Sequence, residues 1–441
     1  MKVNIEDISA VEKRLQVELP PEEVARAVDR TCQKLSREVD LKGFRKGRVP
    51  KSVLKRLFRE HIEERAAELL INETLPRAVR ESGLEPILRP MVETYGRVDE
   101  KEAFTYTATV DIRPEFELPR EAYIGIEVEK PSEEVSEEEV DEYLEALRYT
   151  FAEVRKAEED HVLRERDVAI IAFKAYEGEK PVPGHEAEAL YVDVGTGEFD
   201  ARVEEALIGH RAGDRVEVEV EYPEDALNEL LAGKKIRYEV TIREIYVREL
   251  KPLDDEFVKK MNLGFESVEH MRERVRARLR EERKRKAEEK LRENLLGKIL
   301  EKVEFPVPER YIEFKIAQML EGIAQDLESR GHTFESAGIS VERLRKKLRP
   351  VAERQAREEF VLEKIAEQEN ITVTQEEMEE KAREMARASG GKPEDAMRVI
   401  MTYMVPKLLA EKTLQFLIAQ ANLKDGRENE ASGETGEAGE G

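Results

Sequence analysis

Several residue types that mark redox and metal chemistry are scarce in this chain. It has no tryptophan, aromatic residues make up 6% of it, and Cys32 is the single cysteine among 441 residues. One cysteine cannot form an intramolecular disulfide, and its helical spacing with Val24, Val28 and Leu35 predicts a buried core position. The six histidines show no metal-ligand spacing with one another or with Cys32, so we predict no metal site.

Long apolar runs and nucleotide-binding motifs are missing too. There is no window of about 18 apolar residues that could span a bilayer, and residues 1–20 hold no apolar signal segment. We therefore expect no membrane contact and a cytoplasmic location. A P-loop is absent, and Gly195-Thr196-Gly197 is followed by Asp200 where a dinucleotide-binding loop needs its third glycine. The sequence predicts no cofactor.

Charged residues are abundant instead. They make up 39% of the chain and leave a net charge of -24 at pH 7. Such acidity argues against broad coating of nucleic acid, so any contact with a polyanion should be confined to one place. The length of the chain suggests about three domains, and the low aromatic content favours a helix-rich protein.

Residues 42–59 reverse the charge of the chain. Gly43 and Gly47 bracket residues 44–46, which predicts a tight exposed loop, because glycine tolerates the positive φ of such turns. Pro50 suits the start of the helix expected next. A charge run is usually a solvated helix face, but a cationic loop also suits phosphate groups. The segment contains no acid and eight basic residues, Lys42, Arg45, Lys46, Arg48, Lys51, Lys55, Arg56 and Arg59.

Apolar periodicity divides the chain into segments of different type. Capping-box pairs at Ser136 with Glu139 and at Thr374 with Glu377 predict two helix starts. Within the strand-rich segment, strands are expected at 168–173, 190–194, 216–220 and 236–245. The predicted segments are an α+β unit at 1–112, an acidic connector at 113–149, a strand-rich unit at 150–247, a helical unit at 248–425 and a disordered acidic tail at 426–441.

The basic loop resembles a known docking signature. The order Gly43, Phe44, Arg45, Gly47 and Pro50, with Lys46 among them, resembles the ribosome-docking motif of the trigger factor family. Members of this family are bacterial chaperones that meet nascent chains at the exit tunnel. The run Ala206–Asp214 is similar to a turn of FK506-binding-protein domains, and that family carries such a prolyl isomerase insert in its middle.

The resemblance implies a multidomain α+β protein. Its parts would be an N-terminal α+β ribosome-docking domain, an FKBP-like β-rich middle domain and an all-α chaperone domain. The implied function is ATP-independent holding of nascent chains in an open conformation, which assists folding and export. The implied partners are ribosomal protein and rRNA near the exit tunnel, together with nascent and unfolded polypeptides. Whether the free protein forms a homodimer is left open.

The resemblance also implies peptidyl-prolyl isomerase activity, for which the sequence retains little of the aromatic pocket. In a hand-made alignment Asp200, Ala201, Arg202 and Val203 replace the Ile-Pro-Gly-Phe piece of the family. Tyr238 keeps an aromatic residue in register, and Phe173 lies in another aligned piece. Polar groups resist burial in an apolar pocket. We therefore expect activity well below that of an intact FK506-binding domain.

Methionines suggest a client surface in the helical segment, because methionine is flexible and polarizable and suits promiscuous binding. Any single methionine is more often an ordinary core residue. Three alternatives to a ribosome-docked chaperone stay open: an enzyme that is primarily a prolyl isomerase, a ribosome-independent or periplasmic holdase, and a helical scaffold. The candidate client-binding residues are Met319, Met378, Met385, Met397, Met401 and Met404.

Overall fold

The computed structural model describes residues 1–425, and the acidic tail predicted at residues 426–441 lies outside them. The chain folds into two compact units, each assembled from segments far apart in the sequence. The predicted fold class is confirmed: the N-terminal region mixes helices and strands, the middle region is rich in β-strands and the C-terminal region is helical. The first unit comprises Met1–Ile126, Leu296–Leu320 and Leu348–Gln420, and the second comprises Glu127–Leu295, Glu321–Lys347 and the chain from Ala421.

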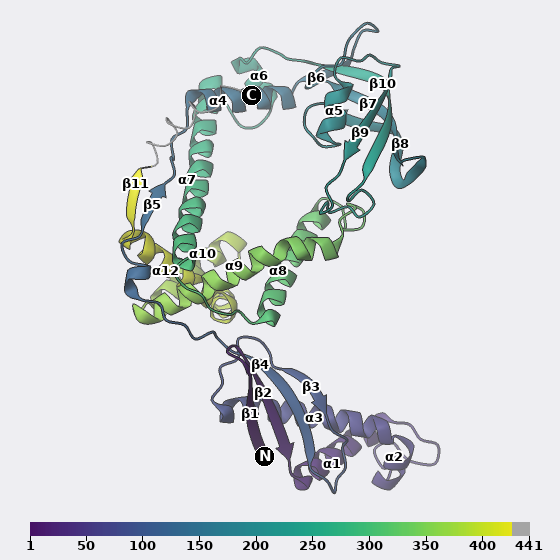
Figure 1. The fold of residues 1–441 in the computed structure, drawn as a ribbon, viewed down its shortest axis with the longest axis vertical. Coiled ribbons are helices and arrows are strands. Elements are labelled where there is room, and N and C mark those ends of the chain that lie inside the picture. The colour runs from purple at the N-terminus through teal and green to yellow at the C-terminus, as the bar shows by residue number, and fades with distance from the viewer. Residues whose placement is uncertain (426–441) are drawn as a thin grey trace, which may run out of the picture. The chain divides into compact units, whose positions relative to one another are not determined.

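A four-stranded antiparallel sheet forms the N-terminal part of the first unit (Figure 1). Leu15, Val17 and Leu19 are buried whereas Gln16 and Glu18 between them are exposed, as the period of two predicts. The first strand was not predicted, because nearly all of its side chains are exposed. In the order β1-β2-β4-β3, the strands are β1 (Lys2–Ser9), β2 (Glu12–Leu19), β4 (Phe104–Asp111) and β3 (Met91–Tyr95).

Helices α1 and α3 share one hydrophobic core with this sheet. Cys32 is 3% exposed in this core, which confirms the prediction that it is buried. The helix predicted after Pro50 divides at Phe58, whose φ of -128° and ψ of 37° are not helical. The ring of Phe58 packs against the core, so the break lets it face inward. The helices are α1 (Pro21–Glu38), α2 (Lys51–Leu57) and α3 (Arg59–Ser82).

The rest of the first unit is helical. Asp111, at the end of β4, is 2% exposed and forms an ion pair with Arg310. Burial raises the pKa of Asp111, and the charge of Arg310 opposes that rise. Thr374 caps its helix through the predicted capping box with Glu377. These elements are η1 (Arg120–Ala122), α10 (Gln375–Ser389), α11 (Pro393–Val399), the π-helical turn η2 (Ile400–Met404) and α12 (Val405–Gln420).

A five-stranded antiparallel sheet forms the centre of the second unit, with order β6-β10-β7-β8 and β9 paired to β10. Its core includes Ile171, Val192, Leu207, Ile236 and Ile242. The four predicted strands are present, and β6 is additional. The elements are β6 (Glu153–Lys156), β7 (Val168–Glu177), β8 (Lys180–Asp193), α5 (Ala201–Leu207), β9 (Arg215–Glu221) and β10 (Lys235–Glu249).

The second unit also contains a two-stranded parallel sheet and parts of long helices. Strand β5 pairs with β11, and the sequence predicted neither β11 nor this pairing. Ser136 forms its predicted capping box with Glu139. None of the helices within residues 1–425 combines the length and the apolar character that crossing a bilayer requires. The elements are β5 (Glu127–Lys130), α4 (Glu137–Thr150), α6 (Asp255–Lys260), α7 (Val268–Leu300), α8 (Glu309–Ser329), α9 (Val341–Gln368) and β11 (Asn422–Asp425), and α7 to α9 run through both units.

Candidate functional site

The basic loop between α1 and α2 consists of two consecutive turns. Gly43 has a φ of 96° and Gly47 a φ of 80°, so both adopt the left-handed conformation that favours glycine. The amide of Phe44 donates to the carbonyl of Leu41 at 3.0 Å. The amide of Gly47 donates to the carbonyl of Ser36 at 2.8 Å and so ties the loop to α1. The predicted tight loop is therefore present.

The C-terminal side of the loop is anchored in the core. Val49 is buried, and its amide donates to the hydroxyl of Ser36 at 3.2 Å. Pro50 occupies the N-cap position of α2, and Leu54 on that helix is buried. The loop therefore begins and ends on residues that are held by buried contacts.

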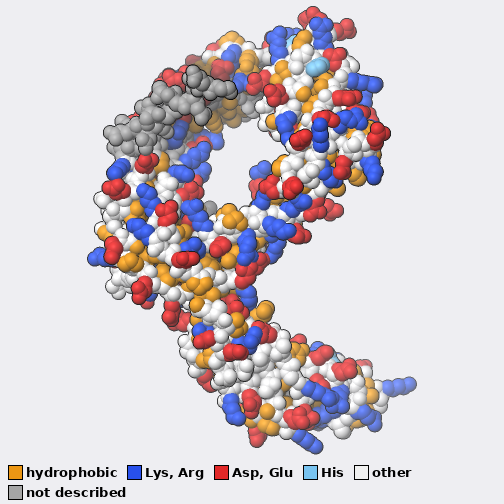
Figure 2. Space-filling view, viewed as in Figure 1, with side chains coloured by type: hydrophobic (Ala, Val, Ile, Leu, Met, Phe, Trp, Pro, Cys, Tyr) orange, Lys and Arg blue, Asp and Glu red, His pale blue; other side chains and the backbone are white. Residues whose placement is uncertain are grey.

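The tip of the loop projects its side chains into solvent. Phe44 is 39% exposed, and the side chains of Arg45 and Lys46 are exposed. Lys and Arg side chains gather around the loop next to α2 (Figure 2). Among the described residues, neither Arg45 nor Lys46 forms an ion pair with an acid of this chain. Their charge is therefore available to another molecule.

The helical part of the basic segment differs from the loop. Lys51 forms an ion pair with Glu100 at 2.9 Å, and Lys55 pairs with the same carboxylate. Arg59 pairs with Glu63 at 2.8 Å. These cations are neutralised within the chain, as is expected for a solvated helix face. The free charge of the segment is concentrated at the loop.

An aromatic cluster occupies one side of the five-stranded sheet. The rings of Phe173 on β7 and Phe199 lie edge to face at 4.7 Å. The ring of Tyr238 on β10 lies 5.9 Å from Phe199, and its hydroxyl is 2.8 Å from the hydroxyl of Tyr222. The structure thus brings the two predicted pocket residues, Phe173 and Tyr238, together. It adds Phe199 and Tyr222, which the hand-made alignment missed.

Asp200 and Arg202 border this cluster as a pair. Their side chains meet at 2.9 Å, the guanidinium of Arg202 lies 4.8 Å from the ring centre of Tyr222, and the Tyr222 hydroxyl donates to Asp200 at 2.8 Å. Burial would raise the pKa of Asp200, but the hydrogen bonds from Arg202 and Tyr222 lower it overall. The two charges that the sequence placed at the pocket therefore satisfy each other.

A buried carboxylate positions Phe199. Glu204 is 1% exposed and accepts the backbone N–H groups of Gly195, Gly197 and Phe199, each at 2.9 Å. The amides of the glycine loop, residues 195–199, donate to this carboxylate, so they cannot bind a phosphate at the same time. The sequence signal for this arrangement was the short spacing between the two glycines, Phe199 and Glu204, whereas the glycines alone resemble an incomplete nucleotide-binding motif.

The predicted client residues lie mainly between helices. Met378 and Met385 on α10, Met397 on α11 and Met404 on η2 are half-buried, as is Met319 on α8. Met401 is 65% exposed, and nearby Val399 is also exposed. The elements α10, α11 and η2 pack on one another, so five of the six methionines belong to one helical cluster.

Within residues 1–425, no group of three or more His, Cys, Asp or Glu side chains is placed to hold a metal ion.

Comparison with known proteins gives one consistent result. Family models described as bacterial trigger factor protein and as its C-terminus match residues 1–147 and 267–419. A trigger factor from Syntrophotalea carbinolica is 32% identical over 96% of this chain and 97% of its own length. One from Moorella thermoacetica is 33% identical over 100% of this chain and 99% of its own. A solved structure of the trigger factor chaperone, described in terms of promiscuous substrate recognition, is 27% identical over 95% of this chain and 99% of its own, with a TM-score of 0.47.

Proposed function

The chain belongs to the bacterial trigger factor family, whose members are ribosome-associated chaperones, and from that premise we propose how its parts divide this work. The region at 1–112 docks on ribosomal protein and rRNA near the exit tunnel. The region at 248–425 holds nascent and unfolded chains without ATP. We place the protein in the cytoplasm. The region at 150–247 is an auxiliary arm, joined through the connector at 113–149.

One observation supports the docking assignment above all others. In a chain of net charge -24, the cations at the tip of the basic loop have no acid partner among the described residues, whereas the neighbouring Lys51 and Lys55 do. Unpaired Lys and Arg can displace counterions from phosphate, which favours binding to rRNA. Arg45 adds a planar fork for phosphate or carboxylate, and Phe44 adds an apolar contact beside it.

Co-sedimentation with bacterial ribosomes tests this proposal. We expect the triple variant Phe44→Ala/Arg45→Ala/Lys46→Ala to lose binding while its circular dichroism spectrum is unchanged. The matched control, Lys51→Ala/Lys55→Ala, also removes two positive charges, but from lysines that are already paired with an acid of the chain. This control variant should still bind. Binding of the unaltered chain should weaken as salt rises, because phosphate contacts release counterions. Undiminished binding of the triple variant would rule out docking through this loop.

Client binding is the second part of the proposal. The cluster formed by α10, α11 and η2 presents Met401 and Val399 to solvent, and the half-buried methionines beneath them can change rotamer to fit different apolar segments. Many weak contacts of this kind delay collapse of a client without consuming nucleotide. Met401→Glu should make the protein less able to suppress the aggregation of a refolding protein. The control is Lys407→Glu on the exposed face of α12, which changes the charge by more than Met401→Glu does and should leave this suppression intact.

A second candidate function, weak prolyl isomerisation, is favoured by the aromatic cluster. Rotation about the amide bond has a barrier of about 18–20 kcal/mol. An apolar surface formed by Phe173, Phe199 and Tyr238 would favour the twisted, less polar amide. The polar pair Asp200 and Arg202 at its border argues for activity well below that of an intact FK506-binding domain. The cis-to-trans relaxation of a proline tetrapeptide should be accelerated weakly, and Tyr238→Ala should abolish that acceleration.

A further inference from the structure

The tip of the α8–α9 hairpin contacts a loop of the five-stranded sheet, within the second unit. This loop, residues 222–234, connects β9 to β10. The amide of Ser340 donates to the carbonyl of Leu227 at 2.9 Å, and its hydroxyl donates to Glu229. Ser340 also begins α9, because its carbonyl accepts the amide of Leu344 at 2.9 Å. One residue thus starts the helix and holds the loop.

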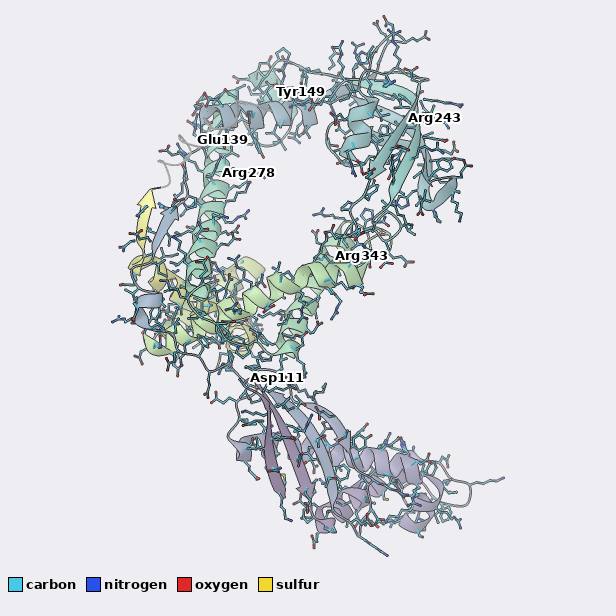
Figure 3. The ribbon with its side chains drawn as sticks, in the orientation of Figure 1. Asp111, Glu139, Tyr149, Arg243, Arg278 and Arg343 are labelled. Atoms are coloured by element: carbon cyan, nitrogen blue, oxygen red, sulfur yellow. The ribbon has the colours of Figure 1, made fainter. Side chains whose placement is uncertain are left out.

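Two cations on the first turns of α9 hold the same loop. The guanidinium of Arg343 donates to the carbonyls of Glu224 and Ala226, the latter at 3.3 Å. The ammonium of Lys347 pairs with Asp225 at 2.7 Å. Positions 343 and 347 are four residues apart and so lie on one face of the helix. Figure 3 shows Arg343 at the end of the helical hairpin next to the loop.

The turn before α9 lies very close to the 222–234 loop, and charged side chains contribute to the contact. A Cβ atom at Gly338 would lie 2.8 Å from the side-chain nitrogen of Asn228, so that side chain would have to shift, and the φ of Gly338, 66°, disfavours any other residue. Among the acids of the loop, Glu229 accepts the hydroxyl of Ser340 at the N-terminus of α9, where the helix dipole is positive, and Asp225 pairs with Lys347. The Lys347 side chain is 45% exposed and that of Asp225 is 70% exposed, so solvent and salt compete with their contact.

The loop is joined directly to the aromatic cluster. Two backbone hydrogen bonds join the two ends of the loop. The amide of Tyr222 donates to the carbonyl of Lys234 at 2.9 Å, and the amide of Gly233 donates to the carbonyl of Pro223 at 3.0 Å. Tyr222, its first residue, places its hydroxyl against Asp200 and Tyr238. A contact that fixes residues 224–229 therefore restrains the segment that borders the cluster.

We propose that Ser340, Arg343 and Lys347 form a releasable, salt-sensitive latch on residues 224–229. With the latch closed, the 222–234 loop keeps one conformation beside the aromatic cluster. With the latch open, the loop exchanges conformations and alters how a proline-containing peptide reaches Phe199 and Tyr238. The last statement rests on the proposed isomerase function, whereas the latch itself does not.

Hydrogen exchange measured by mass spectrometry on the full-length chain tests the latch. Lys347→Glu should make the amides of 224–232 exchange several-fold faster, because loss of the contact lets the loop open locally. The matched control is Lys346→Glu, whose lysine pairs with Glu342 on its own helix at 3.1 Å and leaves the loop contact in place. The swap Lys347→Glu/Asp225→Lys should restore slow exchange. Equal exchange in Lys347→Glu and Lys346→Glu would overturn the latch.

A second readout separates the latch from its effect on the cluster. In the proline-tetrapeptide assay, Lys347→Glu should change KM and the charge swap should restore it. An unchanged KM alongside faster exchange would overturn the access role and leave the latch in place. If the unaltered chain shows no isomerase activity, the proposed isomerase and the access role both fail, and the exchange result still decides the latch.

Discussion

Single side chains set the geometry of both candidate sites without forming their contact surfaces. Ser36 holds the basic loop through its carbonyl and hydroxyl, and Glu204 holds the loop that presents Phe199. Such supporting residues should be sensitive to substitution because each satisfies more than one backbone donor. Removal of a partner leaves a buried donor unsatisfied, which costs more than the hydrogen bond itself contributes.

Glu204 gives the clearest prediction of this kind. Glu204→Ala leaves three backbone N–H groups without their acceptor, so we expect the free energy of unfolding to fall by roughly 1–3 kcal/mol or more. Urea denaturation followed by circular dichroism measures this change. The control is Glu205→Ala, at the exposed next position, which should alter stability by only a few tenths of a kcal/mol. Equal effects of the two substitutions would contradict the assigned role of Glu204.

Tyr123 predicts a stability change at alkaline pH. Burial, and then the hydrogen bond to Glu369, raise its pKa from 10.0 to about 12. The folded state therefore keeps this proton when the unfolded state has lost it, so stability falls as pH rises from 10 towards 12. The loss amounts to about 1.4 kcal/mol per pH unit.

Tyr123→Phe should remove that part of the pH dependence, although it also loses a hydrogen bond worth about 1 kcal/mol at neutral pH. Urea unfolding at pH 9, 10 and 11 provides the comparison. Tyr95→Phe, on an exposed ring, should keep the slope of the unaltered chain. The same slope in Tyr123→Phe as in the unaltered chain would show that Tyr123 does not titrate in this way.

At the scale of elements, local signals predicted the starts of α4 and α10 and four of the five strands of the sheet in the second unit. The capping boxes at Ser136 and Thr374 are both formed, because the residues that make them are three positions apart. The break at Phe58 was not foreseeable from spacing, since it depends on a core assembled from distant segments. The same holds for β11 and for its pairing with β5, because residues 422–425 and 127–130 lie far apart in the sequence.

Thr374 tests the contribution of a capping box to one element. Thr374→Ala removes the acceptor for the Glu377 amide, and we expect α10 to lose about 1 kcal/mol of local stability. Hydrogen exchange at the first turns of α10 reports this loss. Gln375→Ala, one position on, keeps the cap and should leave exchange there unchanged. An α10 that exchanges alike in both variants would remove the cap as a source of its stability.

At the scale of the whole molecule, the order of segments and the loop motif sufficed to indicate the family. The aromatic cluster was only partly foreseen, because Phe199 and Tyr222 come from a glycine loop and a strand end that a linear alignment does not bring together. The contact between the α8–α9 tip and the 222–234 loop had no sequence signal at all. Its partners are separated by more than a hundred residues and are mostly backbone groups.

Deletions test the division of work among the regions. A chain that lacks residues 150–247 should still suppress the aggregation of a refolding protein, because the helical cluster that we assign to clients is retained. A chain that lacks residues 248–441 should not. Light scattering during refolding measures both, with circular dichroism to establish that each shortened chain is folded. Equal suppression by two folded chains would remove the reason for placing client binding in the helices.

Photo-crosslinking on ribosomes that carry a stalled nascent chain tests the central claim most directly. The unaltered chain should crosslink to a photoreactive residue in the emerging polypeptide. Phe44→Ala/Arg45→Ala/Lys46→Ala should lose those crosslinks while it suppresses aggregation of a free refolding protein as well as the unaltered chain does. That result would show that the loop delivers an intact chaperone to the ribosome. Undiminished nascent-chain crosslinks in the triple variant would contradict the account.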